Sequence, residues 1–182
     1  GNARPRHPIV EERTRRLTAY AETTDLNREE LGEDTSLGII TSSTCYQYAR
    51  EVFGEKASIL KLGLVTPLPR QKILDFAAKV DRLLVLEELD PVIEEYCRNL
   101  GLTVQGKDAL PLIGEFSQGL VAEKLGKTPK PWVALDEAVP PRPPVLCAGC
   151  PHRGLFYTLA KHKVTVLGDI GCYTPAAYEP LY

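Results

Sequence analysis

In the middle of the chain, short apolar runs alternate with segments in which apolar residues recur at helical spacing. Continuous apolar or β-branched runs at 37–41, 59–65 and 83–86 are typical of buried strands, and each is followed by a stretch that predicts a helix. A shorter run at 102–104 and the apolar positions over 112–125 form a fourth pair. Four consecutive strand–helix pairs predict a parallel sheet with right-handed crossovers and helices on both faces, an α/β and Rossmann-like fold.

Capping residues mark where two of these helices begin and end. Ser42–Thr44 precede a helix that Gly54 is expected to end. In the third pair, Asp90 is expected to cap a helix with Pro91 in its first position, and Gly101 to end it. This third pair is the clearest strand–helix unit of the chain.

The regions around this block differ from it in composition. Residues 1–36 carry six Arg and eight Asp or Glu, which predicts a charged lead-in arm. Within this arm, residues 11–21 are expected either to form a helix or to be a solvated segment. The block itself, 37–126, is predicted to be one domain, and the proline-rich stretch 127–144 a semi-rigid connector. Residues 145–182 predict the start of a second βαβ domain, with a helix over 154–161 and a strand over 164–167.

Composition narrows the class of protein. Hydrophobic residues make up 43% of the 182 residues, charged residues 25%, and the formal net charge is −2, so a strongly basic nucleic-acid-binding surface is not expected. The chain has no apolar run long enough for a bilayer and no apolar leader, which predicts a cytoplasmic protein without a membrane partner. The absence of Met and the opening Gly1-Asn2-Ala3 indicate a piece of a longer protein.

The central block carries little catalytic chemistry. The three histidines, His7, His152 and His162, all lie outside 37–125, which excludes a Ser–His or Cys–His dyad inside it. Neither dinucleotide nor P-loop glycine patterns follow its first strand. The neighbouring carboxylates at 87 and 88 point to opposite faces of a strand, so a structural or interface role is expected for them rather than acid–base work.

The five cysteines fall into two groups. Cys45 and Cys97 lie within helical patterns and are expected to be buried as small hydrophobic residues. Cys147 and Cys150 form a CxxC pair, and Cys172 follows later. The pair is compatible with a thiol–disulfide couple at a helix N-terminus, with part of a zinc or Fe–S site, or with two ordinary thiols.

Two further segments suggest anion or cation chemistry. Gly168-Asp169-Ile170-Gly171 ends a predicted strand, where backbone N–H groups can approach a phosphate and the carboxylate can face a cation. His152-Arg153 precedes a helix, a position that suits an anion.

These motifs together carry a resemblance to a known family. The segments at 146–153 and 167–174 resemble the opening of the thiamine-diphosphate-binding domain in the alpha subunit of indolepyruvate ferredoxin oxidoreductase. The upstream segments look like the region that precedes this domain: Arg6-His7-Pro8, Leu37–Ser43, Tyr46–Ala49 and Leu60–Gly63. The resemblance implies that 37–126 is a transketolase C-terminal-like domain and 145–182 the truncated start of the cofactor domain. The tail 175–182 departs from the glycine-rich continuation of the family.

The resemblance also implies the chemistry of the whole enzyme. That enzyme decarboxylates indolepyruvate and other arylpyruvates oxidatively with thiamine diphosphate and Mg²⁺, forms an acyl-coenzyme A, and passes electrons through 4Fe–4S clusters to ferredoxin with the help of a beta subunit. It implies a cofactor-binding role for His152, Gly168, Asp169, Ile170 and Gly171, and a metal-binding role for Cys147, Cys150 and Cys172. No catalytic residue is assigned, and the piece is expected to be a supporting one that binds no cofactor and is inactive alone. The rival hypothesis is a stand-alone metal- or redox-binding module built on Cys147 and Cys150.

Overall fold

The chain forms two separate units. The computed structural model describes residues 2–131, 136–141 and 144–177, and it divides into Gly1–Trp132 and Val133–Tyr182. Positions 132–135 and 142–143 of the predicted connector and 178–182 of the tail lie outside the described residues. The first part of the predicted connector packs on the first unit, since Lys130 Nζ lies 2.9 Å from Glu51 Oε1.

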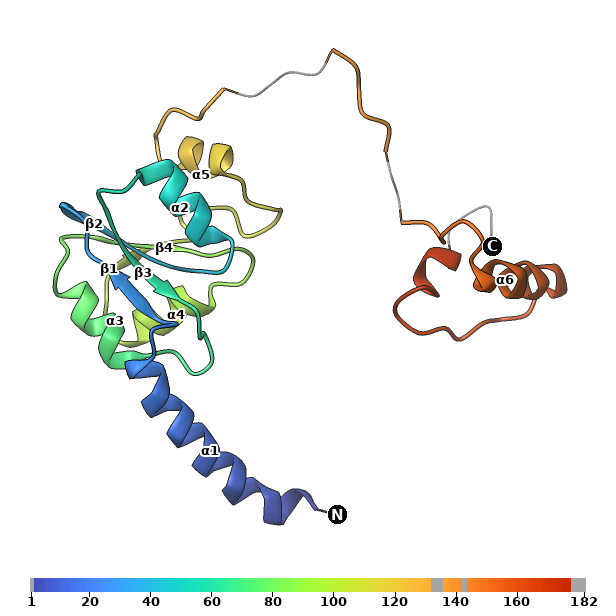
Figure 1. Ribbon diagram of the computed structural model, residues 1–182, viewed down its shortest axis with the longest axis horizontal. Coiled ribbons are helices and arrows are strands. Elements are labelled where there is room, and N and C mark those ends of the chain that lie inside the picture. The colour runs from blue at the N-terminus through green and yellow to red at the C-terminus, as the bar shows by residue number, and fades with distance from the viewer. Residues whose placement is uncertain (1, 132–135, 142–143, 178–182) are drawn as a thin grey trace. The chain divides into compact units, whose positions relative to one another are not determined.

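The first unit is an α/β domain (Figure 1). Its sheet has the strand order β1-β3-β2-β4-β5, in which β2, β3, β4 and β5 are parallel and β1 is antiparallel to β3. The predicted α/β fold is therefore confirmed, and the antiparallel edge strand is an addition to it. In chain order the elements are α1 (Ala3–Thr23), β1 (Arg28–Glu30), β2 (Asp34–Ser42), α2 (Cys45–Phe53), β3 (Ala57–Leu62), α3 (Arg70–Ala77), β4 (Leu83–Leu86), α4 (Val92–Asn99), β5 (Val104–Gln105) and α5 (Gln118–Lys124).

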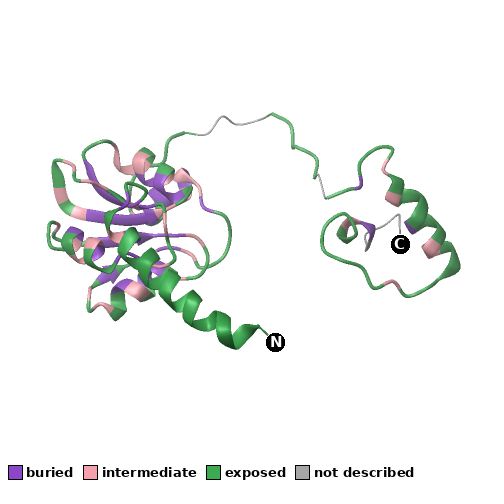
Figure 2. Cartoon of the chain, turned by 60° about the horizontal axis from the view of Figure 1, so that its bottom comes forward, coloured by how far each residue is buried: buried purple, intermediate pink, exposed green. Residues whose placement is uncertain are grey.

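Each face of the sheet has its own apolar core. Successive strand residues point to opposite faces, so Ile39 packs with residues of α2 and α5, and Ile40 packs with residues of α3 and α4. Both side chains are completely buried. In Figure 2 the strands and the inner sides of these helices are buried, whereas α1 is exposed over almost its whole length. Two covered faces explain why β3 and β4 consist of nearly continuous apolar runs.

Helix α4 begins differently from the prediction. Asp90 does not cap it with its side chain; instead the Glu87 carboxylate accepts hydrogen bonds from the backbone N–H groups of Ile93 and Glu94, both at 2.9 Å. The prediction that Asp90 caps this helix is therefore wrong. A carboxylate at the end of β4 can reach the free N–H groups of the next helix because only a short loop separates them.

Helix α5 is shorter than the predicted segment 112–125. Ser117 adopts an extended conformation and its hydroxyl accepts a hydrogen bond from Leu120 N at 3.2 Å, which starts the helix at Gln118. Gly114, at φ +93°, lies in the non-helical residues before it. The apolar spacing in this region arises partly from a loop in which Ile113 is 82% exposed.

Residues predicted to form part of a charged arm are joined to the domain. Residues 28–30 pair with β3, and the Asn27 side chain, which is fully buried, accepts hydrogen bonds from the N–H groups of Gly63 and Leu64. The Glu22 carboxylate accepts from Gln71 N and from the N–H of the following residue, each at 3.0 Å, and so caps α3. These bonds are made by polar side chains to distant backbone groups, so apolar periodicity gives no sign of them.

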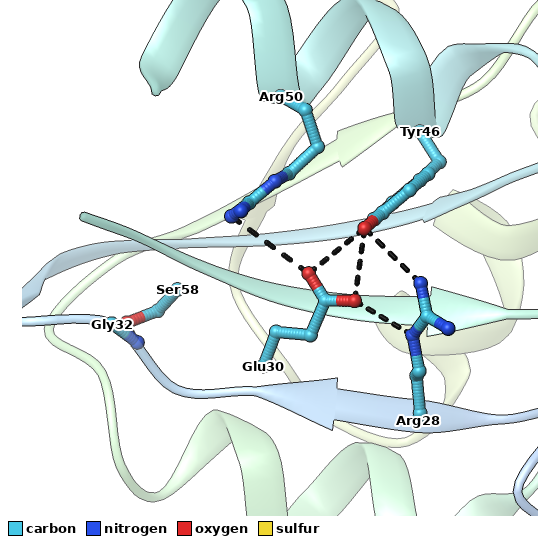
Figure 3. A network of polar contacts seen from close by, with 6 residues as sticks. All are labelled: Arg28, Glu30, Gly32, Tyr46, Arg50 and Ser58. Carbon is cyan, nitrogen blue, oxygen red and sulfur yellow. Dashed lines mark hydrogen bonds and ion pairs between the residues drawn. The ribbon is translucent and has the colours of Figure 1, made fainter. Parts of the chain in front are cut away.

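A polar network fastens β1 to α2 (Figure 3). The hydroxyl of Tyr46 donates to the Glu30 carboxylate at 2.9 Å, and Arg28 Nε donates to the same carboxylate at 2.7 Å. Arg50 completes the ion pairs from the next turn of α2, at 3.8 Å. Strand β1 is short and charged, so it has few apolar side chains to pack on the domain. The hydrogen bonds and ion pairs of this network attach it instead.

The buried thiols make the stability of the first unit sensitive to alkali. Cys97 is completely buried, as predicted, and burial raises the pKa of its thiol from 9.0 to about 12. Burial likewise raises the pKa of the Cys45 thiol, to about 11. The unfolded chain therefore releases these protons first, and stability is lost as pH rises above the unfolded value.

We expect the free energy of unfolding to fall between about pH 9 and about pH 11, by roughly 1.4 kcal/mol per pH unit for each thiol. The substitution Cys97→Ala removes one thiol and should make this slope shallower, whatever its own cost at neutral pH. Urea titrations over this pH range measure it. Cys172→Ala, at an exposed cysteine, is the control; an unchanged slope in Cys97→Ala would contradict the explanation.

The second unit contains helix α6 (Pro151–His162) and the 3-10 turn η1 (Thr174–Ala177). The helix predicted over 154–161 is thus present and begins earlier. The strand predicted over 164–167 is not formed, because no described segment of this unit pairs with it, and Leu167 is 97% exposed. None of the helices in the described part of the chain is both long and apolar enough to cross a membrane.

Candidate functional site

A crevice lies at the carboxyl ends of β2 and β4. The strand order places β3 and β4 on opposite sides of β2, so this is the point where the winding of the sheet reverses and where open α/β sheets bind ligands. The crevice has a volume of about 340 Å³ and is lined by Ser42, Ser43, Thr44, Cys45, Glu87, Glu88, Leu89, Asp90 and Val92.

Glu87 and Glu88, the two glutamates of this crevice, have structural roles. Glu87 caps α4, and burial raises the pKa of its carboxyl group. Glu88 Oε1 accepts a hydrogen bond from Phe116 N at 2.6 Å. The two side chains act on different segments of backbone, which confirms that they are not a close acid–base pair. Cys45 is buried, and its raised pKa favours the neutral thiol.

The CxxC segment forms a tight turn in the second unit. Cys150 N donates a hydrogen bond to Cys147 O at 3.2 Å, and Gly149 has φ +74°, a backbone conformation that glycine adopts without strain. Cys150 is the residue that precedes α6, and Pro151 occupies the first helical position. The sequence Cys-x-Gly-Cys-Pro therefore specifies both the turn and the start of the helix.

Arg153 holds this turn in place from inside the helix. Its Nε donates to the carbonyl oxygen of Cys147 at 3.1 Å, and a terminal nitrogen of its guanidinium donates to the carbonyl oxygen of Leu146. Arg153 thus uses two of its donors on the backbone of its own loop, and its role near an anion stays a prediction.

An aromatic group connects the helix with the glycine loop. His152 lies 5.3 Å from Tyr173 between ring centroids, and Phe156 meets Tyr173 edge to face at 5.6 Å. Beside them is a hollow of about 370 Å³, lined by Phe156, Leu159, Val166, Gly168, Asp169, Tyr173 and Ala176. The two motifs that carry the family resemblance therefore meet within one unit.

The loop 168–171 is open to solvent. Gly168, Asp169, Ile170 and Gly171 are all exposed, and the Asp169 carboxylate accepts a hydrogen bond from Ile170 N at 2.7 Å. The lining of the hollow is mainly apolar, with one carboxylate and no cationic side chain among the described residues. It fits an aromatic ring or a cation near Asp169 better than it fits a diphosphate group, so these residues fit the predicted cofactor in part.

The three predicted metal ligands are not brought together. Cys147 and Cys172 are exposed and Cys150 is half-buried. Within the described residues, no three His, Cys, Asp or Glu side chains are arranged to hold a metal ion. A cluster held by these three thiols does not fit the present arrangement.

The sequence singled out Glu87 and Arg153 but did not reveal the groups that they bind. Glu87 as a cap and Arg153 as a clamp act on backbone groups, and no sequence pattern specifies those partners. The only available signal for Arg153 was its position three residues after Cys150, one turn into the helix.

The chain is similar to a subunit of known oxidoreductases. No family model and no solved structure matches the chain. Among curated proteins, it is 33% identical to the indolepyruvate oxidoreductase subunit IorA of Thermococcus kodakarensis, over 99% of this chain and 32% of that protein. The subunit of the same name from Archaeoglobus fulgidus is 35% identical, again over 99% of the chain and 32% of the relative. The chain therefore spans about a third of the length of the curated relatives that it matches, and the resemblance predicted from the motifs is confirmed.

Proposed function

Since this chain is similar, along nearly its whole length, to about a third of the indolepyruvate oxidoreductase subunit IorA, we propose that it is a supporting segment of such an oxidoreductase. The similarity over 99% of the chain is the observation that carries the proposal. The reaction would be the oxidative decarboxylation of indolepyruvate or a related arylpyruvate to an acyl-coenzyme A. Electrons would pass to ferredoxin, and a beta subunit would complete the enzyme.

The first unit would support and orient the parts of the enzyme that react. In the crevice at the carboxyl ends of the strands, Glu87 and Glu88 already accept hydrogen bonds from backbone N–H groups. Cys45 of the same crevice is buried, and its raised pKa favours the neutral thiol. These observations favour a structural role for the unit.

The second unit would contribute to the cofactor site of the whole enzyme. Thiamine diphosphate supplies the electron sink for decarboxylation of a 2-oxo acid, and Mg²⁺ would accompany it. His152 and the loop residues Gly168, Asp169, Ile170 and Gly171 would border it, with the Asp169 carboxylate facing the metal ion. The assignment of Cys147, Cys150 and Cys172 to a 4Fe–4S cluster rests on the sequence motif alone, so no step is derived from it.

The proposal predicts that this chain alone does not bind thiamine diphosphate tightly. Isothermal calorimetry with Mg²⁺ should give a dissociation constant weaker than about 1 mM, because the hollow offers the diphosphate no cationic partner.

In the full-length subunit, Asp169→Ala should weaken the binding of thiamine diphosphate with Mg²⁺ by about tenfold or more, as loss of a metal-binding carboxylate does.

Asp81→Ala is the matched control, since Asp81 is an exposed aspartate of the first unit, outside the proposed site. Tight binding by the isolated chain would contradict the supporting role. Full activity with indolepyruvate in the Asp169→Ala enzyme, at limiting cofactor, would contradict the assignment of the loop.

A further inference from the structure

We propose that Cys147 and Cys150 form a reversible intramolecular disulfide in the metal-free chain, with a small-molecule disulfide such as glutathione disulfide as the electron acceptor. The proposal concerns the turn itself and does not depend on which reaction the whole enzyme carries out.

The turn already has the separation that a disulfide needs. Cys147 and Cys150 are its first and fourth residues, joined by the backbone hydrogen bond of 3.2 Å, and β-turns bring the two Cα atoms at these positions within about 7 Å. Protein disulfides join Cα atoms roughly 4.4–6.8 Å apart. Bond formation therefore requires side-chain rotation rather than refolding of the segment.

The turn is held in this form by groups that the disulfide does not disturb. Arg153 donates to the carbonyl groups of Leu146 and Cys147, and Gly149 provides the positive φ. Neither group uses a thiol as its partner. The two cysteines thus stay near one another in the reduced state, which raises the effective concentration of one thiol for the other.

The exposure of the five cysteines favours Cys147 and Cys150 as the pair that forms the disulfide. Cys147 is exposed and can meet a dissolved disulfide, while Cys150, at the start of α6, is half-buried three residues away. Cys45 and Cys97 are buried in the first unit. Cys172 is exposed in another loop, and among the described residues it belongs to no group of three side chains that could hold a metal ion.

The exchange is balanced in electrons and atoms. The sulfur of Cys147 attacks one sulfur of glutathione disulfide, so that a mixed disulfide forms and one glutathione thiol leaves. The sulfur of Cys150 then attacks the Cys147 sulfur of this mixed disulfide and releases the second glutathione. Two protein thiols are oxidised, one glutathione disulfide is reduced, and the two protons pass to the released thiols. The oxidised turn has no thiolate to offer a metal, so disulfide formation and metal ligation exclude one another.

The test uses the chain after removal of metal with a chelator. It is equilibrated without oxygen at a series of ratios of reduced to oxidised glutathione, quenched with acid, alkylated and measured by intact and peptide mass spectrometry. We expect a species two hydrogens lighter than the reduced chain, with Cys147 and Cys150 joined. Cys150→Ser should instead accumulate one glutathione on Cys147.

Cys172→Ser is the matched control and should change the glutathione ratio at half-oxidation by less than about twofold, because this cysteine lies outside the turn. Circular dichroism of each variant checks that α6 is retained. The proposal is overturned if the folded wild-type chain forms only mixed disulfides, or if Cys172 takes an equal share in the intramolecular bond.

Discussion

Replacement of Glu87 by Ala should lower the free energy of unfolding of the first unit by about 3 kcal/mol. The substitution leaves the N–H groups of Ile93 and Glu94 without their side-chain acceptor, and both residues are buried. It also removes a negative charge from the positive end of α4. Urea denaturation followed by circular dichroism measures the change.

Two further variants separate capping from general helix effects. Glu95→Ala removes an exposed acid from the same first turn of α4 and should cost less than about 0.5 kcal/mol. Glu87→Gln keeps the size of the side chain but offers one acceptor oxygen in place of two. Its free energy of unfolding should therefore lie between those of Glu87→Ala and Glu95→Ala. Equal stability of Glu87→Ala and Glu95→Ala would show that the cap contributes nothing.

Replacement of Gly32 by Ala should destabilise the first unit by about 2–3 kcal/mol. A Cβ atom at this position would lie 2.1 Å from the carbonyl oxygen of Lys56 and 2.8 Å from that of Ala57, and both are backbone atoms at the start of β3. The loop between β1 and β2 would have to move away, with loss of the bond from Gly32 N to Ser58 Oγ at 3.2 Å. Thermal unfolding monitored by circular dichroism gives the effect.

Leu31→Ala is the control beside it, since Leu31 is half-exposed and its truncation should change stability by less than about 0.5 kcal/mol. If residues 28–34 were an arm independent of the domain, both substitutions would leave the unfolding transition unchanged. The comparison therefore tests whether the domain begins before residue 37.

The sequence was informative wherever burial controls the pattern. The runs at 83–86 and 59–62 are strands because both faces of the sheet are covered, and Cys97 could be placed in the core from its helical spacing alone. Gly54 and Gly101 follow α2 and α4 with positive φ, as their positions after helices predict. These features depend on local spacing and on backbone conformation, which a single sequence displays directly.

The sequence was less informative where a polar side chain acts at a distance. Asn27 and Glu22 bind backbone groups more than 30 residues further along the chain, and neither position differs in type from the surrounding polar residues. The strand predicted at 164–167 failed for the complementary reason: an apolar run forms a strand only where a neighbouring strand satisfies its backbone groups. For the candidate site, the sequence placed the CxxC pair at the start of a helix, as the structure has it, but gave no sign of the clamp by Arg153.

The way α1 is attached has a mechanical consequence. Its final turn is fixed at two points, because Ala21 is buried and Glu22 binds the first N–H groups of α3. The rest of the helix is exposed and is stiffened by its own hydrogen bonds and by ion pairs between its side chains, such as that of Arg15 with Glu12 at 3.1 Å. We therefore expect a force applied to its outer end to be transmitted as a torque to α3 and, through Asn27, to the end of β3, so that this helix would act as a lever on the sheet.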